Sequence, residues 1–298
     1  MQAPTDLPPA PATVAQGLAL AQAQGLDRLD AQLLVLHALG QSAHDRAWLL
    51  AHDTDPLPPQ AQATLTQAVR RRVAGEPLAY ITGHKEFYGL DLVVDARVLV
   101  PRPDTETLVD WALEVLGERP GATVLDLGTG SGAIALALQA TRADLQVHAL
   151  DYSQHALAVA QGNARRLGLP VQFRQGSWLD GMTGCFDAIV SNPPYIAEAD
   201  PHLAALAHEP PQALTSGADG LDDIRTIIRQ APAHLTPGGW LLLEHGYDQA
   251  PAVQALLQAA GLQAVQSRHD LGGIARCSGA RLPGAIPTLA GGRPQDGG

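Results

Sequence analysis

The sequence has little of what several common classes of protein need. Its two cysteines, Cys185 and Cys277, stand far apart with no CxxC pair, so we expect neither a disulfide framework nor a zinc site. None of the eleven histidines belongs to an HExxH pair, and no metal site is expected. No apolar run reaches the roughly 20 residues that cross a bilayer, and the N-terminus lacks the basic-then-apolar order of a signal peptide. We therefore expect a cytoplasmic protein that does not bind membranes.

Positive charge is also scarce. The chain has 19 Lys and Arg residues against 30 Asp and Glu, a net charge of -11. Binding to nucleic acid depends largely on Lys and Arg that neutralise phosphates, so we expect no stable nucleic-acid binding. The cluster Arg70-Arg71-Arg72 could form a local basic patch, but a solvated helix end, whose charges suit the helix dipole, is the favoured interpretation.

The 298 residues are enough for two domains, and the composition changes along the chain. A Pro/Ala-rich flexible tail is expected at 1–12. Leucines spaced three and four apart predict a helical bundle over 13–83, and alternating residues around Gly89 predict a β-hairpin linker over 84–100. An α/β domain is expected over 101–279, and a disordered Gly/Pro-rich tail over 280–298.

Strands and helices alternate regularly within the α/β domain. Strands are predicted at 123–127, 146–150, 171–173, 186–190, 240–243 and 263–268, with helices between most of them. This alternation is typical of a mostly parallel sheet with helices on both faces. Ligands of such sheets bind at the carboxyl ends of the strands, and each motif below follows a predicted strand.

The segment Ser191-Asn192-Pro193-Pro194-Tyr195 follows the fourth predicted strand. Each proline fixes its own φ and disfavours helix at the residue before it, which leaves the carbonyl groups of Asn192 and Pro193 free. The Asn192 side-chain oxygen and a backbone carbonyl can accept both hydrogens of a planar NH2 group while the Tyr195 ring covers its face. We predict a site that holds a weakly nucleophilic amino group; an ordinary strand-to-loop turn is the alternative.

The first three predicted strands end in features that suit an adenosine. A glycine-rich turn, residues 128–132, lets a ligand approach the backbone but matches neither GxGxxG nor a Walker A sequence. Asp151 closes the second strand, where a carboxylate can accept hydrogen bonds from a ribose diol. Trp178 follows the third and could cover an adenine face, or be a core tryptophan. Together they predict an adenosine bound without phosphates, and hence S-adenosylmethionine as the cofactor.

The amino group held at residues 192–195 would then lie beside the sulfonium methyl. Positioning alone can contribute roughly 7 to 11 kcal/mol, and Asn192 would also stabilise charge growing on the nitrogen. The preceding loop, residues 101–106, carries Arg102, Asp104 and Glu106. It could line the site, or it could only begin a helix, with Asp104 and Thr105 as capping residues.

On these residues the chain resembles the PrmC/HemK family, the N5-glutamine methyltransferases of peptide chain release factors. The resemblance covers about residues 75–277. It is carried by Gly75-Glu76-Pro77 with Tyr80 and Gly83, Glu86-Phe87-Tyr88-Gly89, residues 101–106, residues 126–132, Asp151, Asn163, residues 192–196, Glu209-Pro210 with Ala213-Leu214, and Asp270 with Arg276. The first 74 residues match only as a helical pattern.

The resemblance implies a seven-stranded, Rossmann-like class I methyltransferase domain, preceded by a helical domain and a linking hairpin. It implies an enzyme that methylates the glutamine of the Gly-Gly-Gln motif in class I peptide chain release factors. We expect this enzyme to be a monomer. Asn192, Pro193 and Tyr195 would be catalytic, and Asn192, Pro193, Pro194 and Tyr195 would hold the substrate amide. The implied cofactor residues are Gly128, Thr129, Gly130, Ser131, Gly132, Asp151, Trp178 and Asn192.

Two other functions fit part of the sequence. An N6-adenine methyltransferase of nucleic acid could use the same Asn-Pro-Pro-Tyr segment, but it should carry a basic groove. A non-catalytic scaffold that binds release factors could have the same fold, but the intact glycine turn, Asp151 and Asn192 argue against it.

Overall fold

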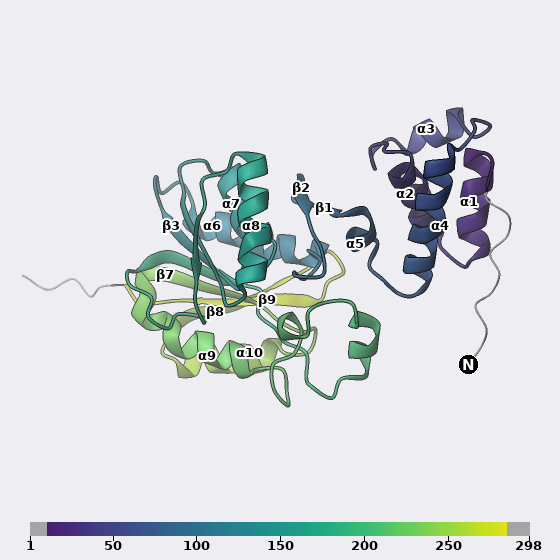
Figure 1. Ribbon diagram of the computed structural model, residues 1–298. Helices are drawn as coiled ribbons and strands as arrows, with labels where there is room; N and C mark the ends of the chain where they lie inside the picture. The colour runs from purple at the N-terminus through teal and green to yellow at the C-terminus, as the bar shows by residue number, and fades with distance from the viewer. Residues whose placement is uncertain (1–10, 285–298) are drawn as a thin grey trace, which may run out of the picture. The chain divides into compact units, whose positions relative to one another are not determined.

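The computed structural model describes residues 11–284, which form two units (Figure 1). Unit 1 contains the described residues up to Glu86 together with Asp91–Val100 and Pro201–Pro210. Unit 2 contains Phe87–Leu90, Pro101–Asp200 and the described residues from Pro211 onward. The expected tails at 1–12 and 280–298 lie mostly outside the described residues.

Unit 1 contains a helical bundle and part of a hairpin. Its helices are α1 (Val14–Ala23), α2 (Arg28–Ala38), α3 (Arg46–Ala51), α4 (Pro59–Val73) and α5 (Leu78–Thr82). Side-chain caps begin the first two, since Thr13 accepts a hydrogen bond from the Gln16 amide and Asp27 from the Asp30 amide. Apolar side chains from all five helices form one core, with Leu34, Leu65 and Val69 fully buried. The predicted helical pattern is thus confirmed.

The three consecutive arginines lie in the last turn of α4. Arg72 pairs with Asp30 on α2 at 2.6 Å, and Arg71 donates to Glu76 from its Nε at 2.7 Å. Two of the three positive charges therefore stabilise the bundle through ion pairs.

The linking hairpin consists of β1 (His84–Phe87) and β2 (Leu90–Val93). Residues 201–210, which the sequence assigns to the methyltransferase domain, instead group with unit 1. The reason lies in their contacts there. The ring Nε2 of His208 lies 3.2 Å from the Ala74 carbonyl, and the buried Glu209 carboxylate accepts a hydrogen bond from the Val100 amide at 3.1 Å.

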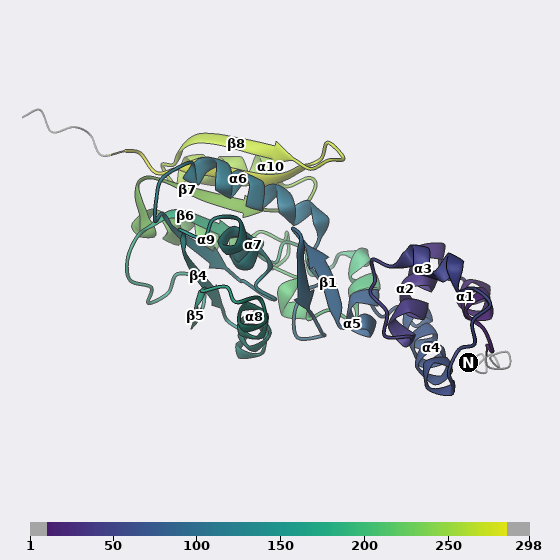
Figure 2. The same cartoon turned by 90° about the horizontal axis from the view of Figure 1, so that it is seen from above.

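Unit 2 is built on a seven-stranded sheet of order β5-β4-β3-β6-β7-β9-β8. Helices α6, α7 and α8 cover one face and α9 and α10 the other (Figures 1 and 2). The strands are β3 (Thr123–Leu127), β4 (Gln146–Asp151), β5 (Gln172–Gln175), β6 (Phe186–Ser191), β7 (Leu235–Glu244), β8 (Gln263–His269) and β9 (Ala275–Arg281). The helices are α6 (Glu106–Leu116), α7 (Ala133–Thr141), α8 (Gln154–Leu167), α9 (Asp222–Gln230) and α10 (Ala250–Ala259). Neighbouring strands from β5 through β7 are parallel, while β9 runs antiparallel to both β7 and β8. This confirms the mostly parallel sheet with helices on both faces.

The last strand corrects one boundary. β9 continues to Arg281, whereas the sequence places the end of the domain at 279 and a disordered tail from 280. The side chain of Ala280 is fully buried, because β9 lies between β7 and β8 in the sheet. Residues 285–298 of that predicted tail lie outside the described residues.

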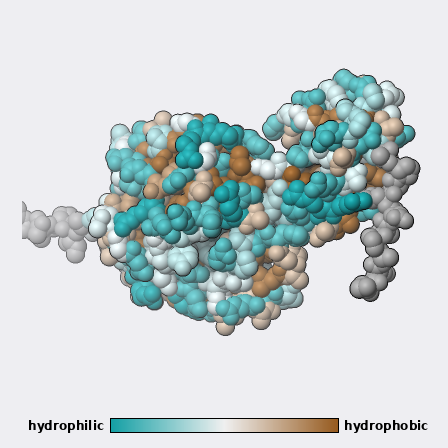
Figure 3. All heavy atoms as spheres, viewed as in Figure 1, coloured by the Kyte–Doolittle hydropathy of each residue, from teal (hydrophilic) through white to brown (hydrophobic). Residues whose placement is uncertain are grey.

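The surface of the molecule is mixed in character. The face in Figure 3 is mostly hydrophilic and is interrupted by small hydrophobic patches. Among residues 11–284, no helix is both long enough and apolar enough to cross a bilayer.

Candidate active site

The predicted site residues of unit 2 gather where its parallel strands end. Leu127, the last residue of β3, pairs with Leu150 on β4 and with Ser191 on β6, and Ser191 in turn pairs with Leu243 on β7. This register places four carboxyl ends at one edge of the sheet. The glycine-rich turn, Asp151, Asn192 and Glu244 each lie at, or directly after, one of these ends.

The glycine-rich turn is held by hydrogen bonds to the strands and helices around it. The amides of Gly128 and Thr129 both donate to the Leu150 carbonyl, at 2.8 and 2.9 Å. The Thr129 hydroxyl donates to the buried Asp126 carboxylate at 2.6 Å. The side chain of Asn163, buried on α8, donates to the Ser131 carbonyl at 3.0 Å. The turn is therefore fixed before any ligand binds.

The last glycine of the turn is required by its surroundings. Gly132 begins α7 with a φ of 87°, a conformation that costs other residues roughly 1–2 kcal/mol. A Cβ there would lie 3.0 Å from Leu136 Cδ1 and 3.2 Å from Ala160 Cβ. Its missing side chain therefore lets the turn pack closely against α8.

Asp151 is oriented by two backbone amides. One carboxylate oxygen accepts from Gly130 at 2.9 Å and the other accepts from Ser153 at 2.8 Å. Burial raises the pKa of Asp151 and these two bonds oppose the rise. A carboxylate offers about four acceptor positions, so two remain for further donors. This donor-seeking carboxylate beside an open glycine backbone fits the ribose of the expected cofactor.

Trp178 lies over the glycine-rich turn. A Cβ built on Gly128 would lie only 3.4 Å from the ring atom Cζ3 of Trp178, and the indole N–H donates to Asp223 on α9 at 3.0 Å. Trp178 has a φ of 47°, an unfavourable left-handed conformation for a bulky residue. Such local strain is typical of functional sites, and the ring does lie at the expected end of the sheet.

The Asn192 side chain is held by Thr105, the residue that precedes α6. Its Nδ2 donates to the Thr105 hydroxyl oxygen at 3.2 Å, so the amide oxygen Oδ1 is turned away from that contact. Thr105 is only 4% exposed and makes no capping bond to α6. Of the two interpretations of residues 101–106, capping by Thr105 is wrong, and this residue instead contacts Asn192.

Tyr195 lies next to a buried carboxylate, Glu244, at the end of β7. The phenol donates to Glu244 Oε1 at 3.5 Å, while Glu244 Oε2 is buried without a hydrogen-bond partner among the described residues. Burial raises the pKa of Glu244 to about 7, and hydrogen bonding from Thr105 opposes this rise. Burial raises the pKa of Tyr195 as well, so its hydroxyl stays protonated.

The loop after Asn192 is pinned by its backbone. Gln249 donates from its side chain to the Tyr195 carbonyl at 3.0 Å. The Ile196 amide donates to the Leu214 carbonyl at 2.9 Å, and its carbonyl accepts from Ser216 at 3.0 Å. Within residues 11–284 no backbone amide donates to the Pro193 carbonyl. These contacts hold the loop in one conformation.

Two features of the site were not predicted from the sequence. One is the contact of Thr105 with Asn192, and the other is the buried carboxylate of Glu244 beside Tyr195. A signal for Glu244 was present, because it follows the apolar run Leu241-Leu242-Leu243 just as Asp151 follows the apolar end of β4. Arg276 on β9 brings a positive charge near Glu244. Its Nε lies 2.8 Å from Asp270 and 3.3 Å from Asp104.

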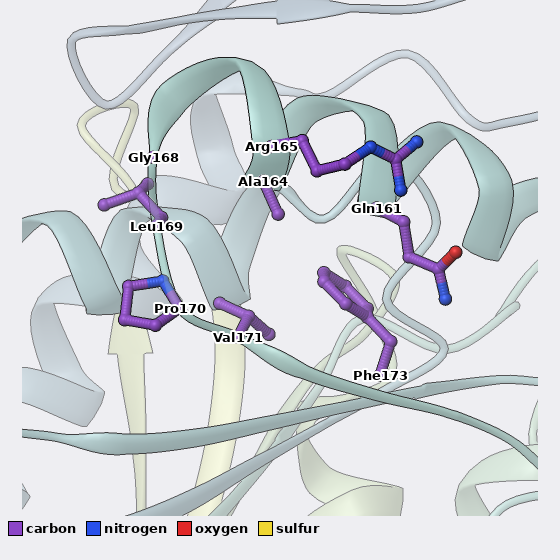
Figure 4. A pocket seen from close by; sticks show the side chains of 8 residues that line it. All are labelled: Gln161, Ala164, Arg165, Gly168, Leu169, Pro170, Val171 and Phe173. Atoms are coloured by element: carbon purple, nitrogen blue, oxygen red, sulfur yellow. The ribbon is translucent and has the colours of Figure 1, made fainter.

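The described part of the chain holds no group of three or more His, Cys, Asp or Glu residues that could bind a metal ion. A shallow pocket with a volume of about 450 Å³ lies between the end of α8 and the start of β5 (Figure 4). The Phe173 ring and the Arg165 side chain line it. It lies at the amino end of β5, away from the carboxyl ends where the site residues gather.

The fold and the site define a class I methyltransferase. The family profile described as the methyltransferase small domain matches residues 109–260. The crystal structure of a methyltransferase from Pyrococcus furiosus has the same fold, with a TM-score of 0.52 and 21% identity over 75% of this chain and 98% of that chain.

The particular family follows from the sequence comparisons. The profile of the PrmC N-terminal domain matches residues 16–83. The release factor glutamine methyltransferase of Bordetella pertussis is 51% identical over 87% of this chain and 96% of its own length. That of Xylella fastidiosa is 49% identical over 90% of this chain and 98% of its own length. The chain belongs to the release factor glutamine methyltransferase family, which confirms the resemblance noted from its motifs.

Proposed function

We propose that this protein transfers a methyl group from S-adenosylmethionine to the side-chain amide nitrogen of the glutamine in the Gly-Gly-Gln motif of class I release factors. The observation that carries the proposal is the fixed amide of Asn192, whose Nδ2 is engaged by Thr105. Its Oδ1 is left as an acceptor after β6, the strand that pairs with β3, and the glycine-rich turn follows β3.

The cofactor is assigned to residues 128–132, Asp151 and Trp178, with Asn192 beside the reacting methyl. The turn offers a close approach to backbone, and Asp151 keeps acceptor positions free for ribose hydroxyls. Trp178 provides an aromatic face over the turn. S-Adenosylmethionine, when bound, supplies a methyl group already activated by its sulfonium.

The protein's own residues then have to position a poor nucleophile. Asn192 Oδ1 and the Pro193 carbonyl accept the two hydrogens of the glutamine NH2 group, and the Tyr195 ring covers its face. Pro194 keeps this backbone extended. S-Adenosylmethionine held there would supply the methyl carbon to the nitrogen lone pair, and its sulfur would keep the electrons of the broken carbon–sulfur bond. The same two oxygens stabilise the positive charge on nitrogen, and its proton leaves to water.

The remaining assignments concern the setting of the enzyme. We propose that it acts as a monomer in the cytoplasm on class I release factors, without stable binding to nucleic acid. The excess of acidic residues over basic ones and the ion pairs of Arg71 and Arg72 support the last of these.

The substitution Asn192→Ala tests the cradle. We expect methyl transfer to fall by about 100-fold or more, the usual cost of removing a preorganised polar group from a transition state, while the affinity for S-adenosylmethionine changes by less than about 3-fold. Radiolabelled cofactor with a release factor, followed by mass spectrometry of the modified residue, measures the transfer; calorimetry measures the affinity. An undiminished rate would remove Asn192 from the mechanism.

The control is Gln263→Ala, an exposed residue at the start of β8, which should change neither quantity. A parallel reaction with adenine-containing DNA tests the alternative of N6-adenine methylation. Label on DNA and none on the release factor would favour that alternative.

A further inference from the structure

The Gln249 side chain lies directly before α10 but makes no capping bond to that helix. Its amide oxygen Oε1 instead accepts from the Gly246 backbone amide at 2.8 Å. Its Nε2 donates to two backbone carbonyls, that of Tyr195 at 3.0 Å and that of Asp219 at 3.3 Å. A backbone N–H only donates and a carbonyl only accepts, so these three partners permit one orientation of the amide.

Two glycines leave room for these contacts. A Cβ built on Gly246 would lie only 3.1 Å from Gln249 Oε1. Gly220 has a φ of 76°, and a Cβ there would clash with the Tyr195 carbonyl oxygen and lie 2.8 Å from its carbon. A side chain at position 220 would therefore displace the carbonyl to which Gln249 donates.

The Tyr195 backbone matters because it forms one end of the cradle. The rings of the two prolines before it fix their own φ. The place of the Pro193 carbonyl therefore depends on how the residues on either side of the prolines are held. Asn192 is held at one end by Thr105, and Tyr195 is held at the other end by Gln249.

We propose that Gln249 is a positioning residue, which holds the Tyr195 backbone so that the Pro193 carbonyl and the Tyr195 ring are in place for the substrate amide. This inference rests on the proposed methylation of a glutamine amide. Among residues 11–284, the Gln249 side chain forms its hydrogen bonds with the backbone of Gly246, Tyr195 and Asp219. Its loss should therefore slow methyl transfer without weakening cofactor binding.

A carboxyl group in place of this amide separates the proposed role from general packing. Gln249→Glu keeps the shape of the side chain. When ionised, the carboxylate can still accept from Gly246, but it has no proton to donate to the Tyr195 carbonyl and opposes it with negative charge. When protonated, the group has one acceptor oxygen and one O–H, so it can reproduce both contacts. The variant should therefore work better in its protonated form.

The surroundings favour that protonated form. The carbonyl oxygens of Tyr195 and Asp219 would raise the pKa of the introduced carboxyl group, and the Gly246 N–H would oppose this rise. The Asp219 carboxylate is paired with Arg225 at 2.5 Å, and Asp248 precedes the altered position in the chain. Burial lowers the pKa of His245, which keeps this ring uncharged near neutral pH.

The test compares Gln249→Met and Gln249→Glu in the full-length protein. Methyl transfer to a release factor is measured from pH 5.5 to 9 and expressed as a ratio to the original protein at the same pH, with cofactor affinity by calorimetry. Gln249→Met has no amide and should lower kcat by about 10- to 100-fold at every pH, as small misplacements of reacting groups do. Gln249→Glu should show a similar loss at pH 9 and recover several-fold as the pH falls to 5.5. Cofactor affinity should change by less than about 3-fold in both.

The matched control is Gln254→Glu, which introduces the same group on α10. Gln254 is half-buried like Gln249 and also donates from its Nε2, but to the Ser267 hydroxyl on β8 at 2.8 Å. Its ratio to the original protein should stay near one at every pH.

The outcomes separate this inference from the proposed function. If the original protein modifies no glutamine, the proposed function fails. If it does, and Gln249→Met keeps the original rate, the inference about Gln249 alone is refuted. A Gln249→Glu ratio that is equal at pH 9 and pH 5.5, or a loss of cofactor affinity as large as the loss of rate, would overturn it as well. Should one variant fail to fold in urea unfolding, the other decides by its own criterion.

Discussion

Replacing Asp151 by Ala separates the role of this residue in binding from its role in the fold. Hydrogen bonds to a charged group contribute about 1.5–3 kcal/mol, so losing the ribose contacts should weaken S-adenosylmethionine binding by roughly 10- to 150-fold. The fold should lose little. The substitution removes the bonds from the Gly130 and Ser153 amides, but it also removes a carboxylate whose pKa is raised by burial, and these effects oppose each other.

Calorimetry of cofactor binding and urea unfolding measure the two effects separately. The control is Asp144→Ala, which removes a carboxylate just before the amino end of the same strand. Like Asp151, Asp144 accepts a backbone hydrogen bond, here from Gly121 at 3.2 Å. An Asp151→Ala affinity within about 3-fold of the original, or an equal loss in Asp144→Ala, would show that another residue holds the ribose.

Two further predictions concern stability. Gly132→Ala should lower the free energy of unfolding by at least about 1–2 kcal/mol because residue 132 has a left-handed backbone. Gly162→Ala, with open space around it inside α8, should raise the free energy of unfolding by about 0.5–1 kcal/mol. Equal effects of the two substitutions in urea unfolding would contradict the packing of the turn on α8. Burial raises the pKa of Asp126 from 3.8 to about 7. The folded state therefore holds this proton more tightly than the unfolded chain does, and Asp126 lowers stability as the pH rises from about 4 to 7. The free energy of unfolding of Asp126→Asn minus that of the original protein should consequently be larger at pH 8 than at pH 5. An equal difference at both pH values would contradict this.

The strands of unit 2 could be predicted where their burial is uniform. β3 and β6 are apolar runs bounded by turn residues, and their predicted bounds agree within one residue with the structure. β9 was missed because its sequence, Ala-Arg-Cys-Ser-Gly-Ala-Arg, shows no apolar alternation. Its Gly279 reads as a strand breaker, but a Cβ there would lie 2.6 Å from Leu242 Cδ2 and 2.8 Å from Trp111 Cη2. Only the packing of β9 against β7 and α6 explains why this glycine lies within a strand.

The site residues could be predicted where a polar residue or a glycine-rich turn directly follows a predicted strand. Asn192, Asp151 and the glycine-rich turn lie where the strand ends place them. Helix capping was one of two interpretations left open for Thr105, because a threonine before a helix usually caps it. Its contact with Asn192 joins positions 87 residues apart, and no local pattern records such a pairing.

The place of β9 in the sheet has a consequence for synthesis of the chain. β7 is complete at Glu244, but its open edge is paired only when residues 275–281 return beside it. Until those residues emerge from the ribosome, β7 presents an unpaired apolar edge of the kind that promotes aggregation. Helices α1 to α4 depend on contacts close in sequence and can form early. A chain cut before Ala275 should therefore keep its first helices, but the Glu244 carboxylate would be open to water on the side that β9 covers.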